Sequence, residues 1–170
     1  MLVDTRRGIR LGAYLALLGS FFLIVFSGYL RRQLRSAEGE GGWLASVAYG
    51  GGLAAAGVAL LRASFDLAAA VSADHGGNPD VASLYYTLRF EFYFLFAAPM
   101  AAVVASTSLI ALRFGVLPRW LGWLGIPITL FALAPLLPGA AAFATFFWTT
   151  ATSLVLVVQA LRVAAARTAG

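Results

Sequence analysis

The sequence predicts an all-α fold, a polytopic transmembrane helical bundle of about five spans in a single domain over residues 1–170. The first observation is composition: 61% of the residues are hydrophobic and only 11% are charged, whereas a soluble domain is about half apolar and roughly a quarter charged. The second is that the apolar residues form long uncharged runs, and a helix needs about 20 such residues to cross a membrane. A soluble fold of this length has too small an interior to bury these runs.

Three uncharged runs predict the first three spans, over residues 11–30, 42–61 and 92–112. A charged turn of Arg, Gln and Glu residues separates the first span from the second. The longest polar stretch, about residues 72–82, lies between the second and third spans. It is rich in Gly, Asp and Asn, so we expect an exposed loop there.

The last apolar run extends over residues 120–161, about twice the length that one crossing requires. Its centre reads Pro-Leu-Leu-Pro-Gly from Pro135 onward, and this combination of Pro and Gly is typical of a turn. We therefore expect two spans, over residues 120–137 and 140–161.

Arginine positions predict the orientation, because cytoplasmic loops of membrane proteins carry an excess of basic residues. With five spans, the side that holds the C-terminus carries Arg31, Arg32, Arg35, Arg113, Arg119, Arg162 and Arg167, and the other side carries Arg6, Arg7, Arg10, Arg62 and Arg89. We expect the C-terminus in the cytoplasm. The three arginines nearest the N-terminus oppose this orientation, and two explanations stay open: a further helix upstream, or a first span that acts as a signal anchor with its N-terminus inside.

Several chemistries are excluded by composition. The chain has no Cys, a single His and no Lys, which excludes disulfides, thiolate metal sites, haem held by two histidines and Schiff-base catalysis. Asp74, His75, Asn78 and Asp80 are metal-ligand residue types, but one His without a fixed spacing favours a solvated loop. We expect no cofactor and no metal.

Membrane lipids are the expected partners of the basic residues. The net charge is +5, but the arginines are scattered between apolar runs and so do not indicate nucleic acid. In membrane proteins such arginines meet anionic headgroups. The exclusive use of Arg, with much Ala and Gly, indicates a GC-rich and therefore bacterial genome. We expect a multi-pass protein of the bacterial cytoplasmic membrane.

Three stretches carry a resemblance to a known family. They are residues 7–14, residues 31–38 followed by Gly42-Trp43-Leu44, and residues 115–125, which read Gly-Val-Leu-Pro-Arg-Trp-Leu-Gly-Trp-Leu-Gly. In this order they resemble a family of bacterial multi-span membrane proteins of unknown function, common in high-GC Gram-positive bacteria. The resemblance implies the membrane architecture and one further helix upstream. It implies no activity and no catalytic residue.

A candidate polar site lies at the ends of the second and third spans, at Arg62, Asp66, Arg89 and Glu91. Arg62 and Asp66 are four residues apart and share a helix face, so they are able to pair. One arrangement pairs Arg89 with Asp66 and Arg62 with Glu91 across the two helices. Charges inside a membrane often mark a functional path. The alternative is that both helices protrude, which leaves the four charges among headgroups or in water.

An aromatic cluster surrounds this site. Tyr86, Arg89, Phe90, Tyr93 and Phe96 recur at helical spacing, which would allow the arginine to lie over tyrosine rings. The functional interpretation is the rim of a pocket for a lipid or an apolar ligand. The alternative is an aromatic belt at the membrane interface, which needs no ligand.

Small residues in the second span predict a helix-packing face. Four-residue spacing relates Gly50 to Ala54, Gly51 to Ala55 and Gly52 to Ala56. Such faces let helix backbones approach closely in lipid. The partner helix belongs either to the same chain or to another one.

Two functions remain open at this stage. The first is a non-enzymatic structural or accessory bundle that packs with itself, as a homo-oligomer, or with a membrane protein partner. The second is a small transporter, or a protein that binds a lipid or apolar ligand with the charges at the ends of spans two and three. No acid–base pair and no nucleophile–base pair is evident in the sequence, which leans against an enzyme.

Overall fold

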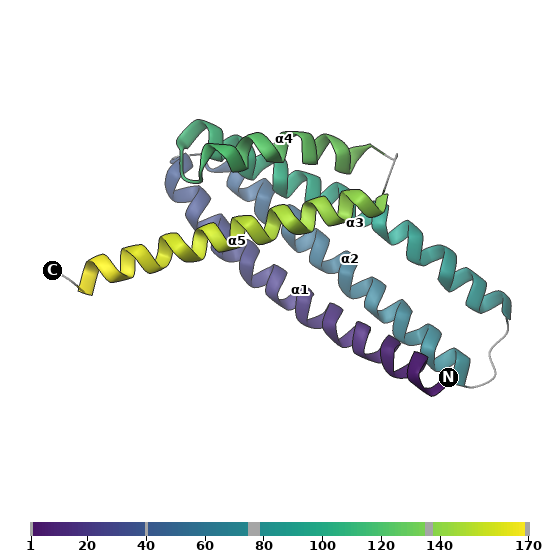
Figure 1. Cartoon of the computed structure of the whole chain (residues 1–170). Helices are drawn as coiled ribbons and strands as arrows, with labels where there is room; N and C mark the ends of the chain where they lie inside the picture. The colour runs from purple at the N-terminus through teal and green to yellow at the C-terminus, as the bar shows by residue number, and fades with distance from the viewer. Residues whose placement is uncertain (1, 40, 75–78, 135–137, 169–170) are drawn as a thin grey trace.

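Five α-helices are present in the computed structural model, which describes residues 2–39, 41–74, 79–134 and 138–168 (Figure 1). In chain order they are α1 (Leu2–Glu38), α2 (Trp43–Asp74), α3 (Pro79–Phe114), α4 (Arg119–Leu133) and α5 (Pro138–Thr168). The described residues contain no strand. The predicted all-α fold is confirmed.

Within the described residues, four helices are long and apolar enough to cross a membrane. Their spanning segments are Leu11–Glu38, Trp43–Ala69, Glu91–Phe114 and Ala140–Ala166. The helix α4 is also apolar, but its 15 residues make a rod about 22 Å long, shorter than the roughly 30 Å of a hydrocarbon core. In place of the expected span over 120–137, the structure has a helix that ends at Leu133; residues 135–137 lie outside the described part.

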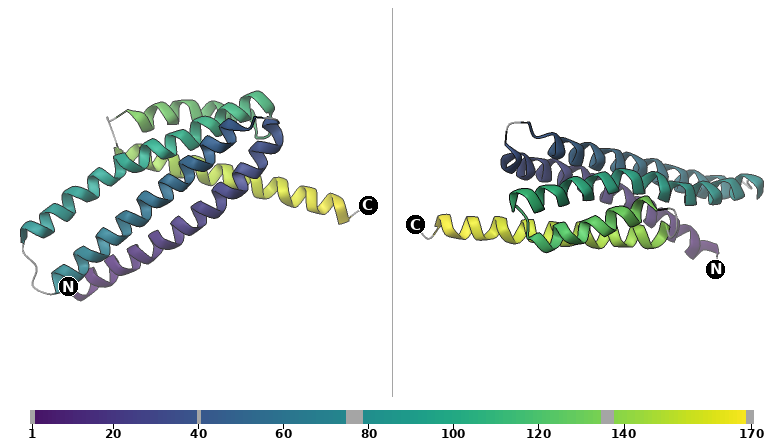
Figure 2. Two further views of the ribbon diagram at one scale, coloured as in Figure 1. Left: turned by 180° about the vertical axis from the view of Figure 1, so that it is seen from behind. Right: turned by 90° about the horizontal axis from the view of Figure 1, so that it is seen from above.

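The helices pack largely in chain order. The helix α1 packs on α2, α2 on α3 and α3 on α4, while α5 packs on both α3 and α4. Seen from above, α4 and α5 lie on the opposite side of α3 from α2 (Figure 2). Short turns place the end of α1, the start of α2, the end of α3 and the start of α4 together, and α5 runs toward and past this end (Figure 1). The N-terminus lies at the other end.

Six arginines gather where these turns lie, and we name this the arginine-rich end: Arg31, Arg32, Arg35, Arg113, Arg119 and Arg162. Two glycines stop helices there. Gly39 (φ 76°) follows α1 and donates its N–H to the Arg35 carbonyl at 3.3 Å, and Gly115 (φ 67°) follows α3 and donates to the Ala111 carbonyl at 3.1 Å. Glycine adopts this left-handed conformation at little cost, so both helices end cleanly.

The carboxylate of Glu38 starts α2. Its Oε1 accepts a hydrogen bond from the Leu44 N–H at 3.1 Å, and its Oε2 accepts one from the Ala45 N–H at 3.0 Å. The first amides of a helix have no partner within the helix and carry partial positive charge. One acidic side chain therefore closes the α1–α2 hairpin and neutralises part of the charge at the arginine-rich end.

Two glycines in the middle of α2 let both neighbouring helices approach its backbone. A Cβ on Gly52 would overlap the hydroxyl of Ser27 on α1, and one on Gly51 would lie 2.7 Å from the carbonyl oxygen of Pro99 on α3. Neither position has room for a real Cβ atom. The close approach of α1 and α3 to α2 therefore depends on the absence of side chains at these two positions.

The three small-residue pairs of α2 point in different directions. Ala55 and Ala56, four residues after Gly51 and Gly52, are fully buried, so these pairs contact helices of the same chain. The third pair, Gly50 and Ala54, is exposed. A turn of about 100° per residue separates neighbouring positions, so three consecutive pairs cannot share one face.

A similar contact joins α3, α4 and α5. A Cβ on Gly125 of α4 would overlap the hydroxyl of Ser108 on α3 and lie 3.1 Å from the Trp148 Nε1 on α5. That Nε1 donates a hydrogen bond to the Leu121 carbonyl of α4 at 3.1 Å. The indole is thus buried with its polar atom satisfied, as burial in an apolar environment requires.

Candidate functional site

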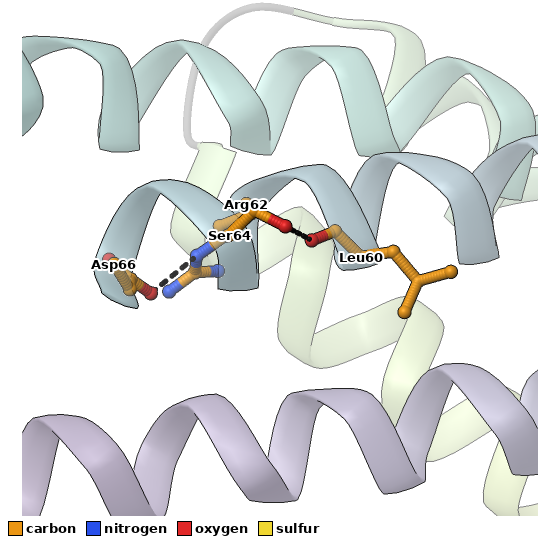
Figure 3. Close-up of polar contacts among 4 residues, drawn as sticks. All are labelled: Leu60, Arg62, Ser64 and Asp66. Carbon is orange, nitrogen blue, oxygen red and sulfur yellow. Dashed lines mark hydrogen bonds and ion pairs between the residues drawn. The ribbon is translucent and has the colours of Figure 1, made fainter. Parts of the chain in front are cut away.

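Arg62 and Asp66 lie on one face of α2 and face each other across one helical turn (Figure 3). The Arg62 Nε and the Asp66 Oδ2 are 3.9 Å apart, and the two side chains are 29% and 31% exposed. Ser64, between them in the sequence, instead bonds the Leu60 carbonyl at 3.0 Å. An ion pair this long and this accessible contributes little to stability. It leaves both groups able to contact another molecule.

The ring of Tyr93 on α3 forms a second contact of Arg62. The guanidinium carbon lies 4.7 Å from the centroid of the tyrosine ring, within the range of a cation–π interaction. Phe92, the preceding residue, is buried and packs its ring against Phe65 of α2 with 5.3 Å between centroids. Tyr93 of α3 thus contacts Arg62 directly, and Phe92 joins α3 to α2 beside it. The sequence also allows a tyrosine contact for Arg89, whose side chain lies outside the described part, so that contact stays a prediction.

The other two residues of the predicted polar site lie on α3. Glu91 is exposed, and the considered Arg62–Glu91 pair does not form, because Arg62 turns to Asp66 and Tyr93 instead. The backbone of Arg89 belongs to α3. Its side chain lies outside the described part, so its pairing with Asp66 stays a prediction.

An open cavity of about 710 Å³ adjoins the ion pair. Arg62 and Asp66 line it from α2, and Phe92, Tyr93 and Phe96 line it from α3. Its remaining walls come from the first half of α1, the middle of α2 and the first turns of α5, through Gly8, Gly12, Ala16, Val58, Ala59, Ala142 and Phe146. Among its described lining residues the cavity is therefore largely apolar, with the Arg62–Asp66 pair at its margin.

A second cavity of about 390 Å³ continues the first toward the middle of the bundle. The two share the lining residues Ala16, Ala59, Phe96, Ala142 and Phe146. In the second cavity, residues of α1 such as Ser20 and Phe26 face Thr149 and Ser153 of α5, and Met100 of α3 also lines it. We name the two cavities together the α1–α5 groove. The groove is an elongated apolar space with its charges at one end.

Helix length places the charged end of the groove near a membrane boundary. Trp43 begins α2 at the arginine-rich end, and Arg62 follows 19 residues later, about 28 Å along the helix axis. This distance is close to the roughly 30 Å thickness of a hydrocarbon core. With the arginine-rich end at one boundary, Arg62 and Asp66 lie at the other, and the groove extends from them into the hydrocarbon.

The short α4 explains why the groove is open. The helix is too short to reach the depth of Arg62, so α5 begins beside the middle of α3, where Ala141 packs with Ala101 and Ala132. The α4–α5 hairpin therefore leaves the second half of α2 and the first half of α1 uncovered beside the ion pair. No described helix covers them on that side, and the cavity fills the space.

The described lining of the groove combines a charged pair with apolar surface. Its charged end holds Arg62 and Asp66, and the other described lining residues are apolar apart from hydroxyls. Those of Ser20, Thr145, Thr149 and Ser153 bond carbonyls of their own helices. In the described part of the chain, no three His, Asp or Glu side chains cluster in a way that would hold a metal ion. Of the loop residues considered as ligands, His75 and Asn78 and the side chains of Asp74 and Asp80 lie outside the described part.

The sequence indicates the charges of this site and, in Tyr93 and Phe96, part of its α3 wall, but not the walls that α1 and α5 contribute. A signal was present, because Gly8, Gly12, Ala16 and Ser20 recur at four-residue spacing on the face of α1 that lines the groove. It was not distinguished from ordinary span composition. The contribution of Ala142 and Phe146 of α5 had no sequence signal, because it depends on where α5 crosses the other helices.

No family model, curated protein or solved structure matches this chain. The resemblance to bacterial multi-span proteins therefore stays a prediction, and the fold and the groove are the observations that bear on function.

Proposed function

We propose that this chain is a multi-pass membrane protein that binds an amphipathic lipid in the α1–α5 groove, the second of the two functions left open by the sequence. The observation that carries the proposal is the joining of an apolar groove to a charged pair at its outer end. An acyl chain would lie against Phe92, Phe96 and Met100, and a headgroup would meet Arg62 and Asp66. Burial of acyl methylenes supplies the affinity.

The charges favour a zwitterionic headgroup. Arg62 and Asp66 have opposite signs and lie 3.9 Å apart, so the pair has no net charge. A phosphate and an amine on one headgroup complement this pair, because each finds an opposite partner. Phosphatidylethanolamine has both groups and two acyl chains, and it is the probe that we choose.

A substitution that fills the groove tests the proposal. Ala142 lies where the two cavities meet, so Ala142→Trp places an indole in the path of the acyl chain. Ala140→Trp is the matched control, because Ala140 is exposed two residues away on the same helix. We expect delipidated protein to bind phosphatidylethanolamine in native mass spectrometry, with Ala142→Trp at least about tenfold weaker and Ala140→Trp unchanged. Equal binding by both variants would contradict the proposal.

The accessory bundle is the second candidate, and one observation favours it. Nothing lies within 4 Å of the positions where side chains of Gly8, Gly12 and Gly19 would begin, so no described helix packs against this small-residue face of α1. A second copy of the chain is able to pack there. The chain has no Cys, so Gly12→Cys would form a disulfide-linked dimer on oxidation in membranes, and Tyr14→Cys would not. A monomeric Gly12→Cys protein would rule out this contact.

For orientation, we propose that the arginine-rich end lies at the cytoplasmic face of a bacterial plasma membrane. Six of the twelve basic residues lie there, and basic residues are retained on the cytoplasmic side. The groove then has its charged end at the outer boundary.

A further inference from the structure

A further open cavity, with a different character, lies at the arginine-rich end. It has a volume of about 770 Å³ and lies between the last turns of α1 and the second half of α5. Its polar lining consists of Tyr29, Arg32, Gln33, Ser36, Gln159 and Arg162. We name it the basic crevice. It shares no lining residue with the α1–α5 groove.

The described lining of the crevice carries positive charge without a compensating carboxylate. Arg32 projects from α1 and Arg162 from α5, both are exposed, and no acidic residue is among the described residues that line the cavity. Glu38 lies nearby in the sequence, but its two oxygens are engaged by the first amides of α2. This contrasts with the groove, where Asp66 faces Arg62. Two guanidinium groups on opposite walls are suited to an anion that lies between them.

The remaining polar side chains fix the walls of the crevice. Gln159 donates from Nε2 to the Val116 carbonyl in the α3–α4 turn at 3.2 Å, and Gln33 donates to the Tyr29 hydroxyl at 2.9 Å. Ser36 donates to the Gln33 carbonyl. Each amide uses one of its N–H donors in these bonds, and Tyr29 acts as an acceptor in its own. The guanidinium groups of Arg32 and Arg162 are the charged donors among the described lining residues, so they are the strongest partners for an anion.

The apolar part of the lining favours a lipid headgroup over a free phosphate as the source of such an anion. Val116, Leu156, Ala160 and Ala164 complete the lining, and Leu156 lies one turn beyond the Ser153 of the groove, toward the membrane boundary. A free phosphate would gain nothing from these side chains, whereas the glycerol and first methylenes of a lipid would pack against them. Basic pockets between transmembrane helices at this level are suited to anionic headgroups.

We propose that the basic crevice binds the phosphate group of an anionic membrane lipid, with Arg32 and Arg162 as the two arms that hold it. The inference is independent of the proposed function, because it uses other residues and a headgroup of other charge.

Lipid titration in native mass spectrometry tests the inference, with delipidated full-length protein and phosphatidylglycerol as the probe. We expect Arg32→Gln and Arg162→Gln each to weaken binding by roughly fivefold, and the double variant by roughly 25-fold. The matched control is Arg113→Gln, since Arg113 is exposed at the same end but does not line the crevice. Thermal melting in detergent establishes that all variants remain folded.

Each other outcome has a definite meaning. An equal loss with Arg113→Gln would overturn the inference, because the attraction would then come from the charge of the whole end. Equal binding of phosphatidylcholine and phosphatidylglycerol by Ala142→Trp, in which the groove is blocked, would overturn it too, since the phosphatidylcholine headgroup has no net charge. Displacement of the lipid by excess inorganic phosphate would retain a phosphate site and overturn its assignment to a lipid. The Ala142→Trp variant should bind phosphatidylglycerol normally, which separates this result from failure of the groove.

Discussion

The indole of Trp148 joins α5 to α4 by a hydrogen bond inside the apolar interior. Most hydroxyls of the spans act differently, since those of Thr149, Thr152 and Ser153 bond the carbonyl four residues earlier in their own helix. Such bonds satisfy the side chain but do not connect helices. Trp148 reaches 27 residues back along the chain. It is therefore a residue whose polar atom contributes to tertiary structure.

Removal of this bond should weaken the bundle. Trp148→Phe retains a ring in the core but has no donor for the Leu121 carbonyl, so we expect a loss of about 1 kcal/mol in the free energy of unfolding. The measurement is unfolding of purified protein by SDS titration from mild detergent. Trp123→Phe is the control, because Trp123 is 65% exposed and should leave stability unchanged. Equal stability of both variants would assign no role to the bond.

Arg62 shows the limit of prediction for a single side chain. Its spacing from Asp66 predicted a shared helix face, and the ion pair lies there. The choice between Asp66 and Glu91 as its partner was beyond the sequence, because it depends on how α2 and α3 are rotated about their axes. The cation–π contact with Tyr93 depends on the same rotation.

Helix α2 is the central element, and its glycines determine how closely the neighbouring helices pack. Gly51 and Gly52 meet α3 and α1, respectively, while Gly50 has no atom within 4 Å of its absent side chain. Gly50 and Gly52 therefore form a natural comparison within one helix, with the same residue type and opposite surroundings.

Alanine at these two positions should have opposite effects on stability. Gly52→Ala puts a methyl group into the Ser27 side chain, and moving α1 away should cost about 1–3 kcal/mol. Gly50→Ala adds a methyl group in open space and should raise the free energy of unfolding by up to roughly 1 kcal/mol, because alanine is the better helix former. Thermal melting in detergent measures both. A similar change in stability with each variant would show that packing does not control this segment.

Helix α4 differs most from its predicted form. The sequence from Trp120 to Leu137 is apolar and long enough for a span, but α4 ends at Leu133. Its shortness is what positions the start of α5 beside the middle of α3, and so leaves the groove open next to Arg62. Hydropathy alone does not predict the end of α4 at Leu133. An apolar residue adds the same amount to the hydropathy of a segment whether it lies inside a helix or in the turn that follows.

Six of the twelve arginines lie at one end of the molecule, and the N-terminus lies at the other end (Figure 1). This predicts that the α1–α2 turn, the α3–α4 turn and the end of α5 face the same compartment. For the end of α5 to face that compartment, the α4–α5 hairpin must enter the membrane and return, although α4 is shorter than a full span.

Cysteine accessibility tests this topology, and the natural chain has no Cys to interfere. We expect Ser36→Cys, Arg113→Cys and Thr168→Cys to react with an impermeant maleimide from one face of sealed vesicles, and Asp80→Cys from the other. The orientation proposed above makes the first face cytoplasmic. Labelling of Thr168→Cys and Arg113→Cys from opposite faces would contradict this topology, because it would show that the α4–α5 hairpin does not return to the side from which it enters the membrane.

The sequence by itself determined the helices and the membrane character of this protein. Apolar runs and the polar breaks between them are local properties of the sequence. A helix forms its backbone hydrogen bonds within itself, and in a membrane, where no water is available to the backbone, an apolar run has few other structures open to it. The spacing of Arg62 and Asp66 was likewise local.

Tertiary structure alone decided which faces meet. The contacts of Gly51 and Gly52, the opening of the α1–α5 groove beside a short α4, and the placement of Arg32 and Arg162 around the basic crevice all join residues far apart in the chain. They result from crossing angles and helix rotations. Lipid tails are as apolar as the helix surfaces, so hydrophobicity does not determine which helix faces meet. The crossing angles and rotations are instead set by how well one helix surface fits against another.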